Sequence, residues 1–143
     1  MENYETLLTR QKKEFEKTPA TFVFTKNEFI STMRAWGLDP EKDTDKIARI
    51  GDTGCIYLLS ESDKVEPVIM RHAKELNDAI AADKTGAGFI KEMFTAALRQ
   101  SDYKSTRREA DALEILGLTI NDVANNSQLA YGLSLAKKAV LSE

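Results

Sequence analysis

The sequence contains little cysteine, histidine or proline: one cysteine, one histidine and three prolines occur among its 143 residues. Cys55 therefore has no partner for a disulfide within the chain, and no pair of cysteines can anchor a zinc site. No apolar run approaches the roughly 20 residues that span a bilayer. Residues 1–10 also lack the hydrophobic core of a signal peptide. We therefore expect a cytoplasmic protein that does not bind membranes.

The sequence also lacks a strong excess of either charge, because 20 Lys and Arg face 23 Asp and Glu, for a net charge of −3. This balance excludes binding to nucleic acid or anionic lipid by bulk charge, and it leaves a local basic patch open. Apolar residues make up 42% of the chain, which is enough to fill one hydrophobic core at this length. We predict a single globular domain over residues 1–143.

Apolar residues recur at helical spacing along most of the chain. Gly37 and Gly117 are each expected to end a helix, because glycine adopts the left-handed conformation that closes the last turn. Thr25 and Thr106, each followed three residues later by Glu, have the spacing of a capping box at a helix start. The predicted helices cover residues 4–18, 25–37, 65–80, 89–98, 106–116 and 129–140, with a shorter one at 119–123 that Thr119 caps.

Short strands are predicted between residues 21 and 59. Residues 21–24 are β-branched and aromatic, and residues 55–59 are a stronger strand of the same kind. Residues 46–50 have two interpretations: a strand that pairs with 55–59, or a helix that runs into the glycine-rich turn at 51–54. The predicted fold is a mostly helical α+β domain, with about six helices around a small two- or three-stranded sheet.

The turn at residues 84–88 is the first candidate for a binding site. Lys84 and Thr85 precede Gly86 and Gly88, and the chain then enters a helix. Amides at a helix N-terminus attract anions, and glycine lets a phosphate approach the backbone closely. The pattern lacks the third glycine and the preceding strand of a dinucleotide site. A phosphate or small-molecule site is one interpretation, and a tight turn between two helices is the other.

The remaining reactive residues indicate structure rather than catalysis. His72 lies on the apolar face of its helix, with no Ser or Cys nucleophile beside it in sequence. Cys55 begins a strand with a buried pattern, whereas a reactive thiol needs an electropositive, partly exposed place. The acids between residues 39 and 45 lack the glycine and the final Glu of a calcium loop, and they indicate the solvated start of a helix. We predict no catalytic residue, no metal site and no cofactor.

The most basic segment of the chain covers residues 99–108 and includes one tyrosine that the pattern predicts to be exposed. Its cations would hold phosphates while the tyrosine stacks on a base. A polar loop after a helix that ends on a cation would have the same composition. The candidate residues for binding nucleic acid are Arg99, Tyr103, Lys104, Arg107 and Arg108.

Residues 107–126 have the spacing of a helix-turn-helix, with Gly117 in the turn and Val123 six residues later. The second helix of this hairpin offers asparagines to a DNA groove, but no Lys or Arg. Only Arg107 and Arg108, at the start of the hairpin, would hold the DNA backbone. A helical hairpin that serves packing alone is the alternative interpretation.

Five segments together carry a resemblance to a known group of proteins: Tyr4-x-x-Leu7-Leu8, residues 19–29, Arg71-His72, Asp83-x-Thr85-Gly86-x-Gly88-Phe89-Ile90-x-x-Met93-Phe94 and Leu116-Gly117-Leu118-Thr119. They resemble a family of small proteins without a known activity that occur on mobile elements and phages of Gram-positive bacteria. The similarity spans nearly the whole chain. It implies an accessory gene whose product acts on host proteins, such as those of a defence system, and it implies no catalytic residues.

Three functional hypotheses follow. The leading one is a non-enzymatic protein-binding module of a mobile element, which acts on a protein partner or by self-association. Exposed Trp36, Tyr57 or Tyr103 would anchor the partner, since aromatic residues dominate binding hot spots. The first alternative is nucleic-acid binding through segment 99–108 and the hairpin at 107–126. The second alternative is a small-molecule or phosphate site at the 84–88 turn.

Overall fold

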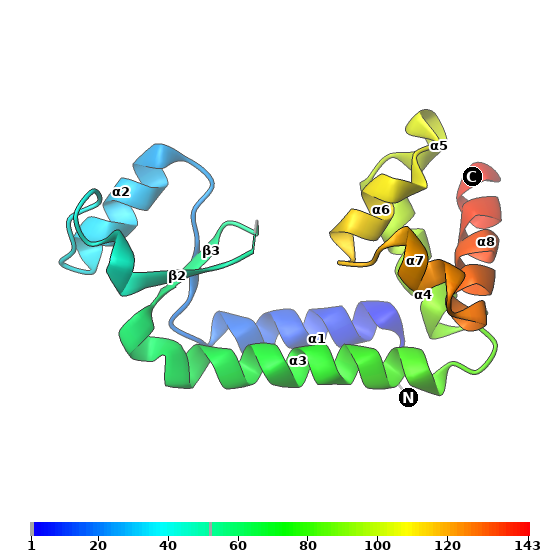
Figure 1. Cartoon of the computed structure of the whole chain (residues 1–143), viewed down its shortest axis with the longest axis horizontal. Helices are drawn as coiled ribbons and strands as arrows, with labels where there is room; N and C mark the ends of the chain where they lie inside the picture. The colour runs from blue at the N-terminus through cyan, green and yellow to red at the C-terminus, as the bar shows by residue number, and fades with distance from the viewer. Residues whose placement is uncertain (1, 52) are drawn as a thin grey trace. The chain divides into compact units, whose positions relative to one another are not determined.

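The computed structural model describes residues 2–51 and 53–143, which form eight α-helices and three short strands (Figure 1). The predicted fold class, a mostly helical α+β structure with a small sheet, is therefore confirmed. The elements in chain order are α1 (Tyr4–Glu16), β1 (Thr21–Phe22), α2 (Lys26–Ala35), β2 (Ile47–Ile50), β3 (Cys55–Leu58), α3 (Ser62–Ala82), α4 (Phe89–Gln100), α5 (Tyr103–Thr106), α6 (Glu109–Ile115), α7 (Ile120–Ala124) and α8 (Ser127–Leu141).

The chain divides into two compact units. The helical unit consists of residues 1–9 and 74–143, and it contains α4 to α8 with the first residues of α1 and the last residues of α3. The sheet unit consists of residues 10–73, and it contains the three strands, α2 and the remaining parts of α1 and α3. The expectation of one domain over the whole chain stays a prediction.

Helix α4 forms the centre of the helical unit. Six of its side chains are buried, and Ile90, Phe94 and Leu98 are fully excluded from solvent. Because these residues recur every four positions, they line one face of the helix, against which α6 and α8 pack. The prediction that residues 89–98 form the most buried helix is confirmed.

The sheet unit is built on an antiparallel sheet with strand order β1-β3-β2. Residues 47–50 pair with 55–58 over four positions, so the strand interpretation of this segment is correct and the helical one is wrong. One face of the sheet carries Ile47 and Ile56, which form a small core with Val23 and with Met33 of α2. The first strand contributes two paired residues, and the chain leaves the sheet towards α2 after Val23 bonds to Gly54.

Several local predictions need correction. There are eight helices in the described chain rather than about six. The five-residue α7 matches the predicted short helix at 119–123, whereas the four-residue α5 was not predicted. Asp39 accepts hydrogen bonds from the Glu41 and Lys42 amides, as a helix cap would, but residues 40–42 form turns, and only a short 3-10 helix (Thr44–Lys46) follows. Thr106 does not cap α6, whose first helical residue is Glu109, since the Thr106 hydroxyl accepts from the Arg108 amide instead.

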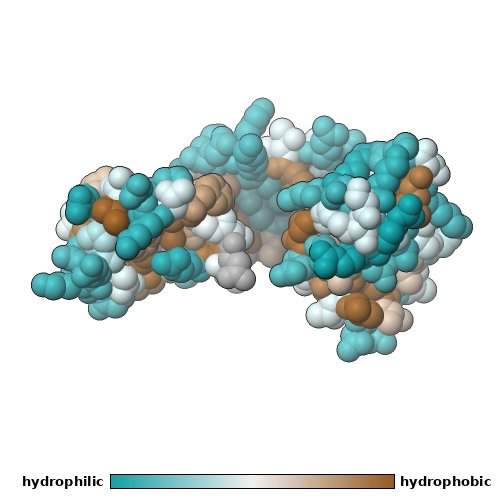
Figure 2. Space-filling view, turned by 90° about the horizontal axis from the view of Figure 1, so that it is seen from above, coloured by the Kyte–Doolittle hydropathy of each residue, from teal (hydrophilic) through white to brown (hydrophobic). Residues whose placement is uncertain are grey.

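Large apolar side chains remain exposed in both units (Figure 2). Phe24 and Met70 of the sheet unit are 73% and 72% exposed, and Ile120 of the helical unit is 64% exposed. Scattered exposed apolar residues are normal, so only those that gather around a common feature call for a functional explanation. None of the helices in the described residues is long and apolar enough to cross a membrane.

Candidate functional site

The amides of the 84–88 turn already have an acceptor inside the protein. The Asp83 carboxylate accepts hydrogen bonds from the backbone N–H groups of Gly86, Gly88 and Ile90 at 3.0, 3.1 and 3.0 Å. Partial burial raises the pKa of Asp83, but these backbone hydrogen bonds outweigh burial and hold the pKa below its ordinary value. The side chain therefore occupies the position in which a bound anion would sit.

The glycines of this turn also have a packing role. Gly86 has a φ of 87°, and a Cβ there would lie 2.2 Å from the main-chain oxygen of Gln128 at the start of α8. A Cβ on Gly132 would lie 2.6 Å from the Gly86 oxygen and 2.4 Å from Cγ2 of Ile90. The turn and α8 therefore approach each other at a distance that only glycine permits. These contacts favour the structural interpretation of the turn, and anion binding by Lys84, Thr85, Gly86 and Gly88 stays a prediction.

The cationic side chains of the basic segment 99–108 already contact carboxylate or main-chain carbonyl groups of the protein. Arg99 forms an ion pair with Glu143 at 2.6 Å, and the Lys104 ammonium donates to the Glu143 main-chain oxygen. Arg107 donates to the main-chain oxygen of Lys104 at 3.0 Å, and Arg108 lies 3.3 Å from Asp111. The structure thus brings Arg99 and Lys104 together at one acidic residue. Use of these cations for nucleic acid stays a prediction.

The expectation of exposed tyrosine anchors is wrong. Tyr103 is 8% exposed and belongs to the core of the helical unit, so its ring is not open to a base. Tyr57 is 6% exposed, and its hydroxyl lies 3.3 Å from Glu66. Trp36 is half-buried against the core of the sheet unit. Charged neighbours and turn residues made Tyr103 look solvent-exposed in the sequence, but the short helix α5 turns the ring inward.

The hairpin at residues 107–126 has the predicted stop and start signals. Gly117 has a φ of 70°, and the Leu118 amide donates to the Leu113 oxygen at 2.9 Å, which closes α6. The Thr119 hydroxyl accepts from the Asp122 amide, and the Asp122 carboxylate accepts from the Thr119 amide. This reciprocal capping box fixes the start of α7 immediately after the turn.

The residues around the Gly117 turn line an apolar groove, which we call the α6–α7 groove. Its volume is about 380 Å³. Ile120 lies on its edge, and Ile115, 45% exposed, ends the preceding helix. Among the described residues no Lys or Arg lines the groove, whereas Glu114 does and is exposed. The groove is lined by Ala110, Leu113, Glu114, Gly117, Leu118, Thr119 and Ile120.

A second exposed feature, which we call the aromatic patch, consists of Phe15, Phe22 and Phe24 in the sheet unit. The rings of Phe22 and Phe24 stack at 14° with centroids 6.0 Å apart, and Phe15 meets Phe22 edge-on at 6.2 Å. Phe22 and Phe24 are 48% and 73% exposed. The sequence prediction missed this patch, although its signal was present: residues two apart on a strand share a face.

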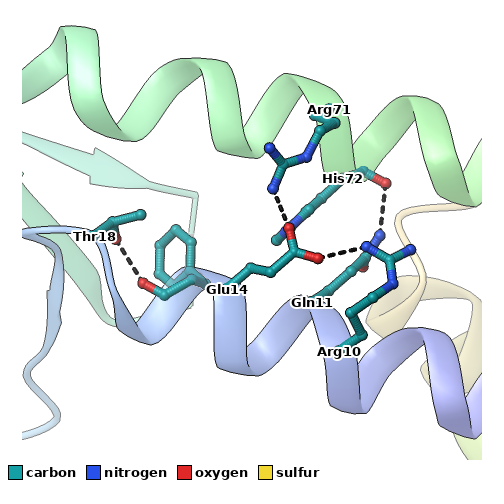
Figure 3. A network of polar contacts seen from close by, with 7 residues as sticks. Arg10, Gln11, Glu14, Thr18, Arg71 and His72 are labelled. Atoms are coloured by element: carbon teal, nitrogen blue, oxygen red, sulfur yellow. Dashed lines mark hydrogen bonds and ion pairs between the residues drawn. The ribbon is translucent and has the colours of Figure 1, made fainter.

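The one histidine of the chain belongs to a polar network between α1 and α3 in the sheet unit (Figure 3). Glu14 lies 3.4 Å from Nε2 of His72, 2.5 Å from Arg10, and in contact with Arg71. The hydrogen bond from Arg10 holds the pKa of Glu14 below its ordinary value, with smaller contributions from His72 and Arg71. The contacts of Glu14 with Arg71 and His72 therefore join α1 to α3 within the sheet unit.

The surroundings of Cys55 and of the acidic segment 39–45 also indicate structural roles. Cys55 is 2% exposed, and burial raises the pKa of its thiol, which is the opposite of what a nucleophile requires. Within the 39–45 acidic segment, the Asp43 carboxylate accepts from the Asp39 amide at 2.7 Å. Within residues 2–51 and 53–143 there is no group of three or more His, Cys, Asp or Glu side chains placed to hold a metal ion.

The fold and these surfaces define a mostly helical α+β protein whose exposed features are an apolar groove and an aromatic patch. The chain belongs to DUF7659, a family of unknown function, whose model matches residues 3–139. This membership agrees with the expected resemblance to a family without a known activity. No match is found among curated proteins or among solved structures. Function is therefore inferred from the two surfaces.

Proposed function

We propose that the protein is a non-enzymatic binding module that takes a protein partner in the α6–α7 groove. The observation that carries this proposal is the combination of an apolar groove of about 380 Å³ with the 64% exposure of Ile120 at its edge. A groove of this size accommodates a large hydrophobic side chain, which is the usual anchor of a protein interface. Ile115, also exposed, extends the apolar surface.

Charge around the groove selects the kind of partner. Glu114 lines the groove, and its carboxylate has no hydrogen-bond or ion-pair partner within the described part of the chain. Exposed charges at the rim of an interface steer partners of opposite sign. The expected partner therefore presents a large hydrophobic side chain flanked by Lys or Arg. The same charge disfavours the DNA backbone, so the hairpin supports protein binding better than helix-turn-helix recognition.

The resemblance to mobile-element proteins supports a further part of this proposal. An accessory protein of a mobile element or phage acts in a host cell, so the partner is expected to be a host protein, such as a component of a defence system. Self-association is the alternative, in which a second copy supplies the hydrophobic side chain.

A displayed library of random peptides tests the groove. The full-length protein is expected to enrich peptides with one large hydrophobic residue beside Lys or Arg, and Ile120→Asp is expected to lose them. Tyr131→Asp is the matched control, because Tyr131 is 51% exposed in the same unit and does not line the groove. Glu114→Lys is expected to enrich acidic peptides instead, because it reverses the rim charge.

Enrichment that is the same for the original chain and for Ile120→Asp would contradict the proposal, as would the absence of any enriched peptide. Sedimentation of the full-length protein over a range of concentrations separates the two kinds of partner. A mass that rises with concentration and is lost in Ile120→Asp would assign the groove to a second copy. With a constant monomer mass, capture from host lysate that depends on Ile120 then identifies the partner.

A further inference from the structure

The aromatic patch has the geometry of a stacking platform. Phe22 and Phe24 are two residues apart in an extended segment, which places both rings on one side of the chain. The rings lie nearly parallel, 14° apart, with 6.0 Å between centroids. Most of the Phe24 ring surface is open, and so is about half of Phe22. The two rings stack on each other, and their exposed surface is open to a flat ligand group.

The platform is held in place by its surroundings. A Cβ on Gly54 would lie 2.8 Å from Cε1 of Phe24, so the turn before β3 packs directly against the ring. The Val23 amide donates to the Gly54 oxygen at 2.8 Å and ties the two segments together. On the other side, Phe15 meets Phe22 edge-on. The rings are therefore ordered before a ligand arrives, which reduces the entropic cost of binding.

Positive charge accompanies the rings. Lys26 follows Phe24 by two residues, and Lys12 precedes Phe15 by three residues on the same face of α1. Lys17 lies just beyond the end of α1. All three lysines are exposed, and none of their ammonium groups has an ion pair or hydrogen bond with the described residues. Among the acids close to these lysines in sequence, Arg10 and Arg71 engage Glu14, whereas Glu16 and Glu28 are exposed.

We propose that the aromatic patch binds single-stranded nucleic acid. Bases of an unpaired strand have open faces that stack on aromatic side chains, and exposed lysines attract the phosphates between them. A duplex hides its base faces in the stack, so it offers nothing to the two rings. This site uses none of the residues of the α6–α7 groove and stands independently of the proposed protein binding. It also differs from segment 99–108, in which the tyrosine is buried.

Fluorescence anisotropy with a labelled oligothymidine of about ten nucleotides tests the proposal on the full-length protein. We expect saturable binding with a dissociation constant between about 1 and 100 µM at about 50 mM salt. The double variant Phe22→Ala/Phe24→Ala is expected to bind at least about tenfold more weakly, because each stacked base loses its partner. Met70→Ala is the matched control, since Met70 is as exposed as Phe24 and lies in the same unit.

Salt dependence tests the part played by the lysines. For a single strand, each phosphate contact contributes about 0.7 to the slope of log affinity against log salt. Lys17→Ala/Lys26→Ala is therefore expected to reduce that slope by about 1.4. Arg107→Ala/Arg108→Ala removes two cations of the helical unit. In this background, the Phe double variant is expected to lose as much affinity for the oligothymidine as it does in the original chain.

Three results would overturn the proposal. The first is no binding of oligothymidine up to about 100 µM protein at about 50 mM salt. If the display selection at the same time enriches peptides that depend on Phe24, the patch binds protein instead. The second is duplex binding as tight as single-strand binding. The third is equal affinity of the Phe double variant and the Met70→Ala control. Circular dichroism of each variant shows that lost binding does not reflect lost folding.

Discussion

The two units of this protein differ in their charge balance and in the kind of surface that each exposes. The helical unit carries 9 Lys and Arg against 12 Asp and Glu, and its conspicuous polar residues, among them Asp83 and Arg99, form bonds inside the protein. The sheet unit carries 11 charges of each sign, and the ammonium groups of Lys12, Lys17 and Lys26 have no partner among the described residues. Polar residues such as Asp83 and Arg99 thus serve folding, whereas exposed apolar side chains form the surfaces proposed here to bind partners.

The sharpest test of the helical unit is its glycine packing. Gly86→Ala is expected to lower the free energy of unfolding by about 3 kcal/mol, because the methyl group overlaps the Gln128 oxygen and the backbone is left-handed. Gly117→Ala shares the left-handed backbone but has open space around its Cβ, so it is expected to cost about 1 kcal/mol. Chemical denaturation measures both. Equal losses would show that the turn does not need its close approach to α8.

A smaller effect is expected at the carboxylate that caps this turn. Asp83→Asn is expected to cost about 1 kcal/mol after solvent screening, because three backbone N–H groups lose a charged acceptor. The folded-state pKa of Asp83 lies below its ordinary value. Its contribution is therefore present above about pH 4 and is lost as the pH falls through the lowered pKa. Unfolding measured against pH should be flatter in Asp83→Asn, and an unchanged profile would contradict this role.

The smallest effect is expected in the sheet unit, at Glu14. Its partners are partly exposed, so salt screens them, and Glu14→Gln is expected to shift the denaturation midpoint less than Asp83→Asn does. The pKa of Glu14 is lowered, so its contribution is also lost as the pH falls below the ordinary Glu value. Glu16→Gln on the same helix is the control. A larger loss for Glu14→Gln than for Asp83→Asn would reverse the comparison between the units.

Local signals in the sequence predicted much of the fold. These signals act through neighbours within five residues. Gly37 and Gly117 end helices as expected, and Thr25 and Thr119 start them. Thr106 failed because its hydroxyl bonds two residues ahead instead of three. The pairing of β2 with β3 depends on a partner strand, so the sequence left residues 46–50 open between strand and helix.

The candidate sites were harder to predict because they depend on which way side chains face. The sequence drew attention to Tyr103 through its basic neighbours, yet the ring is buried. The spacing of Phe22 and Phe24 indicated a shared face, but it did not show that this face would remain exposed. The hairpin at 107–126 was found from its spacing, but the groove beside it exists only once α6 and α7 meet across the turn. The exposure of a side chain depends on tertiary packing, which the amphipathic pattern of a single segment does not determine.

The central claim is that the two units carry different binding surfaces, with nucleic acid assigned to the aromatic patch. A titration of the full-length, isotopically labelled protein with oligothymidine, followed by amide chemical shifts, tests this claim most directly. We expect the changes to concentrate at residues 12–26 and around Gly54, which packs against Phe24. Changes confined to residues 99–108, with the aromatic patch unaffected, would contradict the account.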